Sequence, residues 1–445
     1  MNQAVPPVWL VLPFAGLLIS IALGPIVARR IWHVHYGWAA AAWAILALGL
    51  MIATEGLTPT RIALAATMFE DYLPFILMLF ALYAAAGGVV VSDFDRATPR
   101  LNTLLLALGT VASGLIGATG ASMILIRPLL QANAKRRYKA HVVIFFIFLV
   151  ANIGGVLTPL GNPPLFFGLL SGVDFFWPLR VLWPHFLFTA VLVLAIFYLV
   201  DSALAHKEAQ YAPASEGEAP YLVIRGLPNL ALLLAALGVI LMSASWHPGV
   251  VFNVFGAELA LQDILRDAAL AVIGLVSLAI TPEADRAANH FSWQPLEEVA
   301  KLFAAIFITI IPVIEMLAAN SHGPFAPVIK LLEHADGSPN NAAYFWASGL
   351  LSSFLDNGPT YLVFFTAAGG HAATLMGPMA KTLAAISLGA VFMGALTYIG
   401  NAPNFIVYAL ARRARVDMPG FFGYMVWSGA ILLPVFILVT LLFFR

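Results

Sequence analysis

The 445-residue sequence contains no cysteine and very little charge. Without cysteine, the chain can form no disulfide, thiolate metal site or cysteine nucleophile. Only 10% of the residues are charged, whereas soluble domains carry about a quarter, and the formal net charge is zero. A neutral chain offers no basic surface, so nucleic acid is not an expected partner. Apolar residues make up 61% of the sequence, and the mean hydropathy is +0.92. The composition therefore predicts an integral protein of the lipid bilayer, which we expect in a bacterial inner membrane.

Ten apolar stretches are candidates to cross the roughly 30 Å hydrocarbon core of a bilayer. The first is followed, not preceded, by the basic pair Arg29-Arg30, which predicts a spanning helix rather than a cleaved signal peptide. The stretch at 268–280 is the shortest. The ten predicted spans are 8–28, 38–53, 72–91, 141–170, 181–200, 228–245, 268–280, 301–319, 380–410 and 421–443.

Two further apolar segments, 101–131 and 341–370, are interrupted in the middle by small, polar or proline residues. Each could be one kinked span or a re-entrant hairpin. Basic residues mark the cytoplasmic side of a membrane protein, so flanking charge favours hairpins that enter from opposite faces. Arg96, Arg100, Lys135, Arg136, Arg137 and Lys139 flank the first segment, whereas Glu333 and Asp336 precede the second, which meets no basic residue until Lys381.

One phrase occurs twice: Leu157–Phe166 and Leu396–Phe405 share Leu-Thr-x-x-Gly-Asn-x-Pro. Such a break in a long apolar run, repeated at matching places, predicts two inverted-topology repeats with a transport site at the breaks. We expect an all-α polytopic fold of about ten spans, two hairpins and two broken helices, with the N-terminus outside. The predicted divisions are N-terminal helices 1–61, repeat one 62–200, a cytoplasmic linker 201–227, connecting helices 228–299 and repeat two 300–445, with broken helices 141–170 and 380–410.

Helix breaks inside a membrane expose backbone carbonyls that attract cations and amides that attract anions. Asn162 and Asn401 stand where they could cap the second half-helix, and Thr158 and Thr397 add hydroxyl oxygens before each break. Ordinary proline kinks are the alternative interpretation of these segments. The matched pair favours a binding site.

Asp356 is the strongest candidate for a functional acid, because a carboxylate inside a membrane segment is costly and usually functional. Removal from water favours its protonated form, which would allow proton exchange near neutral pH. Aligning Thr119-Gly120-Ala121-Ser122 with Asp356-Asn357-Gly358-Pro359 makes Thr119 its counterpart and adds Ser122 and Asn357 to the candidate site. The alternative is that Asp356 only caps a half-helix and pairs with a cation.

Two other charged residues lie within apolar segments. Arg127 could bind a substrate carboxylate or neutralise Asp356, or its side chain could extend to the inner surface. Glu315 is a second candidate proton carrier, or lies near the outer end of its helix.

Ser352-Ser353-Phe354-Leu355-Asp356-Asn357, together with the paired Gly-Asn-x-Pro turns, resembles the ion-transporter superfamily, namely its sodium/proton antiporters and citrate transporter-like members. The resemblance covers about 62–443. It implies a homodimer, a scaffold domain and a transport domain that carries the hairpins and broken helices. It also implies ion-site roles for Thr119, Thr158, Asn162, Asp356, Asn357, Thr397 and Asn401.

The dicarboxylate carriers of that superfamily carry Ser-Asn-Thr at both hairpin tips, and this chain does not. Its acidic tip looks more like the cation antiporters. The sequence therefore predicts a sodium/proton antiporter with sodium ion and proton as coupling ions and no other cofactor or transition metal. The alternative is a cation-coupled carrier of citrate or another carboxylate. An intramembrane enzyme is not expected, because the sequence has no His-Glu-x-x-His motif and no paired catalytic aspartates.

Overall fold

The computed structural model describes residues 6–27, 29–92, 98–209, 223–289, 291–319 and 323–445. Arg96 and residues 210–222 of the predicted linker lie outside these residues. Within them, seven helical segments are long and apolar enough to cross a membrane, and three shorter segments are apolar. The predicted all-α polytopic architecture is confirmed.

Each of the ten predicted spans coincides with a helix or a broken helix over most of its described residues. The stretch predicted at 268–280 is the C-terminal part of a 20-residue helix, α11. The spans are α1 (Leu12–Val27), α2 (Arg29–Glu55), α3 to α4 (Leu57–Ala66, Leu73–Ala86), α7 and α8 (Ala140–Leu149, Pro163–Leu170), α9 (Trp177–Ala209), α10 (Leu227–Ser245), α11 (Leu261–Ile280), α13 (Gln294–Ala318), α18 and α19 (Ala380–Phe392, Ala402–Arg413) and α20 (Phe421–Phe443).

Three predicted division points fall inside helices. Residue 61 lies within α3, which continues through a six-residue π-helical segment, η2 (Thr67–Tyr72), into α4. Residues 200 and 300 lie within α9 and α13. Arg61 and Lys301, which lie at two of these division points, are exposed on the helix surface, and the helices pass through them.

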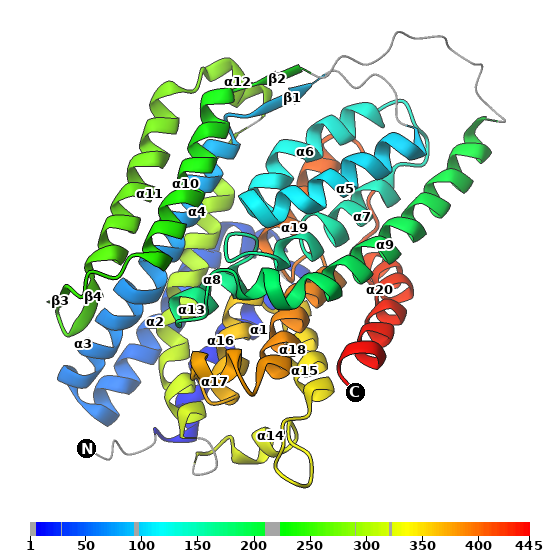
Figure 1. Ribbon diagram of the computed structural model, residues 1–445. Coiled ribbons are helices and arrows are strands. Elements are labelled where there is room, and N and C mark those ends of the chain that lie inside the picture. The colour runs from blue at the N-terminus through cyan, green and yellow to red at the C-terminus, as the bar shows by residue number, and fades with distance from the viewer. Residues whose placement is uncertain (1–5, 28, 93–97, 210–222, 290, 320–322) are drawn as a thin grey trace.

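The helices form two groups (Figure 1). In the first, α2 packs against α1 and α13, and α11 packs against α4 and α10. The second contains both hairpins, both broken helices, α9 and α20. The predicted hairpins are α5 with α6 (Pro99–Ile116, Ala118–Ala132) and α15 with α16 (Asn341–Phe354, Asn357–Ala367), and their open ends lie at opposite ends of the molecule (Figure 1).

Short elements close the two ends. The strands β1 (Val90–Ser92) and β2 (Val223–Arg225) pair antiparallel at one end, and β3 (Val251–Val254) and β4 (Ala257–Ala260) form a hairpin at the other. The remaining elements are η1 (Val8–Val11), η3 (Ile153–Val156), α12 (Glu283–Ala288), α14 (Ala326–Lys330), α17 (Ala372–Met376) and η5 (Met393–Leu396).

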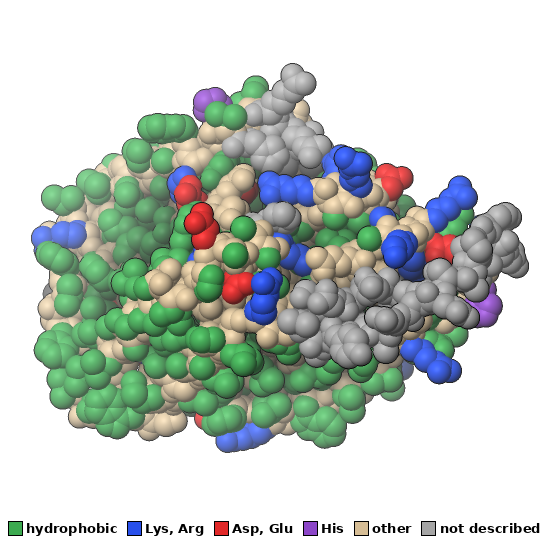
Figure 2. Space-filling model, turned by 90° about the horizontal axis from the view of Figure 1, so that it is seen from above, with side chains coloured by type: hydrophobic (Ala, Val, Ile, Leu, Met, Phe, Trp, Pro, Cys, Tyr) green, Lys and Arg blue, Asp and Glu red, His purple; other side chains and the backbone are tan. Residues whose placement is uncertain are grey.

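Basic side chains gather on the end that carries β1, β2 and α12, and apolar side chains cover the sides of the molecule (Figure 2). Lys135 and Arg137 follow α6, Lys207 ends α9, and Arg225 ends β2, and all four are exposed. This distribution is typical of a cytoplasmic face above a belt of lipid-facing residues.

Candidate functional site

The two helix breaks have the same local geometry. Asn162 and Asn401 are both extended, with φ of −156° and −157°, and each precedes a helix whose first turn contains proline. Neither side chain caps its helix, contrary to the prediction. Instead, Asn162 Oδ1 accepts a 2.6 Å hydrogen bond from Asn357 Nδ2, and Asn401 Nδ2 donates to the carbonyl oxygen of Ala151 at 3.1 Å. The asparagines therefore join the repeats to each other.

Glycine is required at the breaks by close approach of two backbone segments. A Cβ atom on Gly161 would lie 2.2 Å from the carbonyl oxygen of Gly155, and one on Gly400 would lie 2.8 Å from that of Gly394. Neither Gly161 nor Gly400 has a positive φ, so the expected freedom of an unwound turn is not the reason for glycine here.

We expect Gly161→Ala to prevent formation of a stable protein, because a backbone oxygen cannot move aside as a side chain can. A loss of about 3 kcal/mol or more in the free energy of unfolding is expected, at the upper end of overpacking effects. Thermal unfolding of the purified protein in detergent measures it. Gly238→Ala is the control: Gly238 lies within α10, and a Cβ there would meet nothing within 4 Å. Equal unfolding temperatures for the two variants would contradict the close-approach argument.

Thr158 and Thr397 make equivalent contacts. Thr158 Oγ1 donates to the carbonyl oxygen of Gly114 and Thr397 Oγ1 to that of Ser353, each at 2.5 Å. Both hydrogen bonds tie a helix break to the first arm of the hairpin in the same repeat. The two hydroxyl hydrogens are thus already used to position the hairpins, and a role of the oxygens as ion ligands stays a prediction.

The hairpin tips differ in charge at one equivalent position. Asn162 and Asn401 are 239 residues apart (401 − 162), and the same interval relates Gly117 to Asp356 (356 − 117). Gly117 precedes α6 with φ of +82°, and Asp356 precedes α16, where Oδ1 accepts a 3.2 Å hydrogen bond from the backbone N–H of Gly358. The predicted pairing of Asp356 with Thr119 is therefore wrong by two residues. Thr119 lies within the first turn of α6, whereas Asp356 precedes α16. The two segments were aligned because both contain small and polar residues, and that similarity did not reflect equivalent positions.

Asp356, Thr119 and Asn401 line one small inner chamber of about 30 Å³. The first turns of α8 and α19 complete it through Pro163, Ala402 and Pro403. The first helix group closes it with apolar and aromatic side chains: Phe75, Leu79, Tyr83, Pro295, Leu296, Val299 and Phe303. Asp356 is the one charged side chain among the described residues that line this chamber.

A larger cleft of about 330 Å³ meets the same residues. Tyr83, Asp356 and Asn401 line both cavities. The cleft runs between α13 and α19 and extends to Trp32, Ser292 and Arg413. Figure 1 places the start of α13, which lines both cavities, towards the end of the molecule that bears β1, β2 and α12.

Buried amide groups around the breaks lack hydrogen-bond partners. Asn357 and Asn401 are 0% and 1% exposed, and the Oδ1 atom of each has no partner. Nδ2 of Asn162, which is 1% exposed, also has none. A buried polar atom left unpaired costs about 1–3 kcal/mol, so such a group calls for an explanation. Asn401 lines the chamber with Asp356, whereas Asn357 follows Asp356 in the chain and lines neither cavity. Carboxylate and amide oxygens are donors that suit a hard cation such as sodium.

Arg127, Glu315 and Ser122 lie outside the lining of both cavities. Arg127 donates to the carbonyl oxygen of Ala288 and forms no ion pair with Asp356. The cleft follows α13 only as far as Ile306, and Glu315 lies nine residues further, about 13 Å along the helix. Ser122 is buried, and its Oγ has no partner.

Sequence reasoning missed two features. Tyr83 lines both cavities and donates a 2.8 Å hydrogen bond to the carbonyl oxygen of Ser292, but it lies in an ordinary apolar helix and gives no sequence signal. The second is a buried charge cluster at the end of α9.

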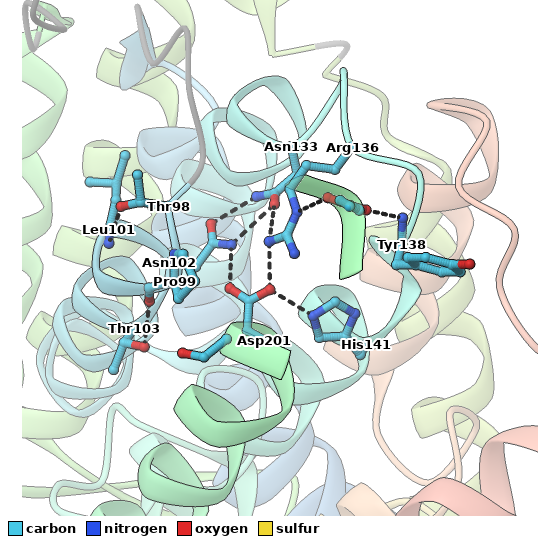
Figure 3. Close-up of polar contacts among 12 residues, drawn as sticks. Thr98, Pro99, Leu101, Asn102, Thr103, Asn133, Arg136, Tyr138, His141 and Asp201 are labelled. Carbon is cyan, nitrogen blue, oxygen red and sulfur yellow. Dashed lines mark hydrogen bonds and ion pairs between the residues drawn. The ribbon is translucent and has the colours of Figure 1, made fainter. Parts of the chain in front are cut away.

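Asp201 lies at the centre of that cluster (Figure 3). Its carboxylate accepts from Arg136 Nη1 at 2.5 Å and Asn102 Nδ2 at 2.9 Å, and its Oδ1 lies 2.8 Å from His141 Nε2. Asp201 is 0% exposed. The cluster thereby connects α9 to three other segments: the two open ends of the first hairpin and the start of α7. An aspartate directly after an apolar run was the available signal, but it was assigned to the linker.

A protein family described as "putative citrate transport" matches residues 3–444. The predicted resemblance to citrate transporter-like proteins is thereby confirmed. No curated protein matches the chain significantly.

Proposed function

The chain belongs to this citrate-transport family, and from that premise we propose that it is a secondary transporter that exchanges sodium ions for protons at Asp356. The observation that supports this choice is the charge of the inner chamber. Asp356 is the one charged side chain among its described lining residues, and no basic side chain lies there to receive a substrate anion. A lone carboxylate in an apolar chamber recruits a cation or a proton.

Competition for one carboxylate couples the two fluxes. With sodium bound or with a proton bound, Asp356 presents no uncompensated charge to its apolar surroundings. Unoccupied, it would be an unpaired buried anion, which costs several kcal/mol. Movement of the second helix group past the first is therefore favoured only when the site is loaded, and that condition makes the transport an exchange rather than a leak.

The proposed sodium ligands are oxygen atoms, as a hard cation prefers. Asp356 supplies the carboxylate, Asn357 and Asn401 supply amide oxygens that have no partner, and Thr119 adds a hydroxyl that lines the chamber. Thr158 and Asn162 hold the surrounding helix breaks and hairpins in place. We further propose a homodimer in a bacterial inner membrane, with the basic face of Figure 2 in the cytoplasm and the N-terminus outside.

A cation-coupled carrier of citrate or another carboxylate is the second candidate, favoured by the description of the family. The first turn of α19 meets the chamber at Ala402 and could receive a carboxylate through its backbone amides. That carboxylate would lie beside Asp356, so a cation between the two acids would be needed to offset their repulsion.

Flux measurements with the purified full-length protein in liposomes separate the two functions. We expect a sodium gradient to change the internal pH reported by a trapped dye, with no change for choline, and no uptake of radiolabelled citrate. Sodium-dependent citrate accumulation, with no proton movement in the absence of citrate, would overturn the proposal and favour the carrier.

A further inference from the structure

One face of α13 forms a wall of the large cleft. The lining residues on this helix are spaced at three and four positions, as expected for one face of a helix. All of them except one are apolar or uncharged. They are Gln294, Pro295, Glu298, Val299, Leu302, Phe303 and Ile306.

Glu298 is the charged residue on this face. It is half-buried and forms no ion pair with any described residue. Its neighbour Glu297 points elsewhere: that side chain is 59% exposed and pairs with Lys301 at 3.3 Å. Of these two adjacent glutamates, Glu298 lines the cleft and Glu297 does not.

We propose that Glu298 gathers cations in the cleft and raises their concentration beside Asp356, a role that rests on the proposed cation exchange. Walls of low dielectric focus the field of a charge into the cleft that it lines, and they raise the local concentration of counter-ions. Phe303 and Ile306 continue the same face of α13 beyond Glu298, and Phe303 also lines the inner chamber. A cation held near Glu298 is therefore on the route to Asp356.

Arg413 is the basic residue of the cleft lining and projects from α19 on the opposite wall. Its side chain is exposed, whereas Glu298 is half-buried. Salt and water screen an exposed charge more strongly than a partly buried one. With Glu298 and Asp356 as the two acids among the described lining residues, the field in the cleft is negative, which selects cations.

The test is Glu298→Gln, with Glu297→Gln as the matched control. Sodium-driven proton movement is measured in everted membrane vesicles, whose proposed cytoplasmic face is outward, at low ionic strength. We expect Glu298→Gln to raise the KM for sodium on the order of fivefold with an unchanged maximal rate. Glu297→Gln and Glu298→Asp should keep the wild-type KM, and choline chloride should reduce the effect of Glu298→Gln.

Three results would overturn the role of Glu298: an unchanged KM in Glu298→Gln, an equal rise of the KM in both glutamine variants, or a loss of maximal rate. The proposed function would still stand if the wild type exchanged sodium for protons. Absence of exchange in the wild type would overturn the proposed function itself. If the protein carries a carboxylate instead, Glu298→Gln should lower the KM for that anion, since a like charge would be removed.

Discussion

Asp356→Asn should abolish sodium-driven proton movement, with a loss of about 100-fold or more, because an amide can neither exchange a proton nor neutralise sodium. The fold should survive the change. Asparagine has the same shape and is an equally good residue at the start of a helix, so it can still accept the hydrogen bond that Asp356 receives from Gly358. Dequenching of a pH-sensitive dye in everted vesicles measures the flux, and the quantity of protein in the membrane is measured in parallel.

Asp336→Asn is the control for Asp356→Asn. Asp336 accepts hydrogen bonds from Ser338 in an exposed loop and lines neither cavity. This variant should transport like the wild type. If Asp356→Asn kept more than about a tenth of the wild-type flux, Asp356 would not be the shared site of the two ions.

Asp201→Asn should lower the free energy of unfolding by about 3 kcal/mol or more. Asparagine removes one of the two carboxylates that contact the buried guanidinium of Arg136, leaving only Glu208 at 3.1 Å, and weakens the contacts with His141 and Asn102 (Figure 3). Breaking a buried ion pair costs more than the pair contributes, because the remaining partner keeps its desolvation cost and loses part of its compensation. The measurement is the unfolding temperature of the purified protein in detergent.

Asp174→Asn is the matched control for Asp201→Asn. Asp174 also forms an ion pair, with Arg180 at 3.4 Å, but the two side chains are 47% and 69% exposed. Exposed pairs contribute about 0–1 kcal/mol, so this variant should unfold near the wild-type temperature. A similar decrease in both variants would show that burial does not set the contribution of the Asp201 cluster.

The two repeats share their order of elements but not their charge. Repeat one has the buried Asp201 cluster on α9, whereas α20, the last helix of repeat two, contains no charged residue. At the hairpin tips the charged residue is in repeat two instead: Asp356 stands there at the position of Gly117 in repeat one.

Local sequence was sufficient for the helices and for the breaks. The length of the apolar runs predicted all ten spans, and the repeated Gly-Asn-x-Pro phrase located both breaks. Flanking charge predicted hairpins entering from opposite ends (Figure 1). The division predicted after residue 61 falls inside α3, because one exposed charge lowers the hydropathy of a run without ending its helix.

Residue composition was not sufficient to align the two hairpin tips correctly. Thr119 and Asp356 were paired because both begin a short polar stretch, but the start of the helix, not the polarity, fixes the equivalent position. Arg127 was a reasonable partner for Asp356 by its place in an apolar segment. Its actual partner, Ala288, is 161 residues away in another part of the fold.

The sequence by itself determined three properties: that this chain lies in a membrane, at which residues the two broken helices are interrupted, and which acid interrupts the second hairpin. Those properties depend on hydropathy and backbone chemistry within about ten residues of each site. The tertiary structure alone decided which residues meet, because the hydrogen-bonded pairs Asn357 and Asn162 are 195 residues apart and Asn152 and Asn404 are 252 apart. Contacts over such intervals arise from the packing of one repeat against the other, and no local pattern encodes them.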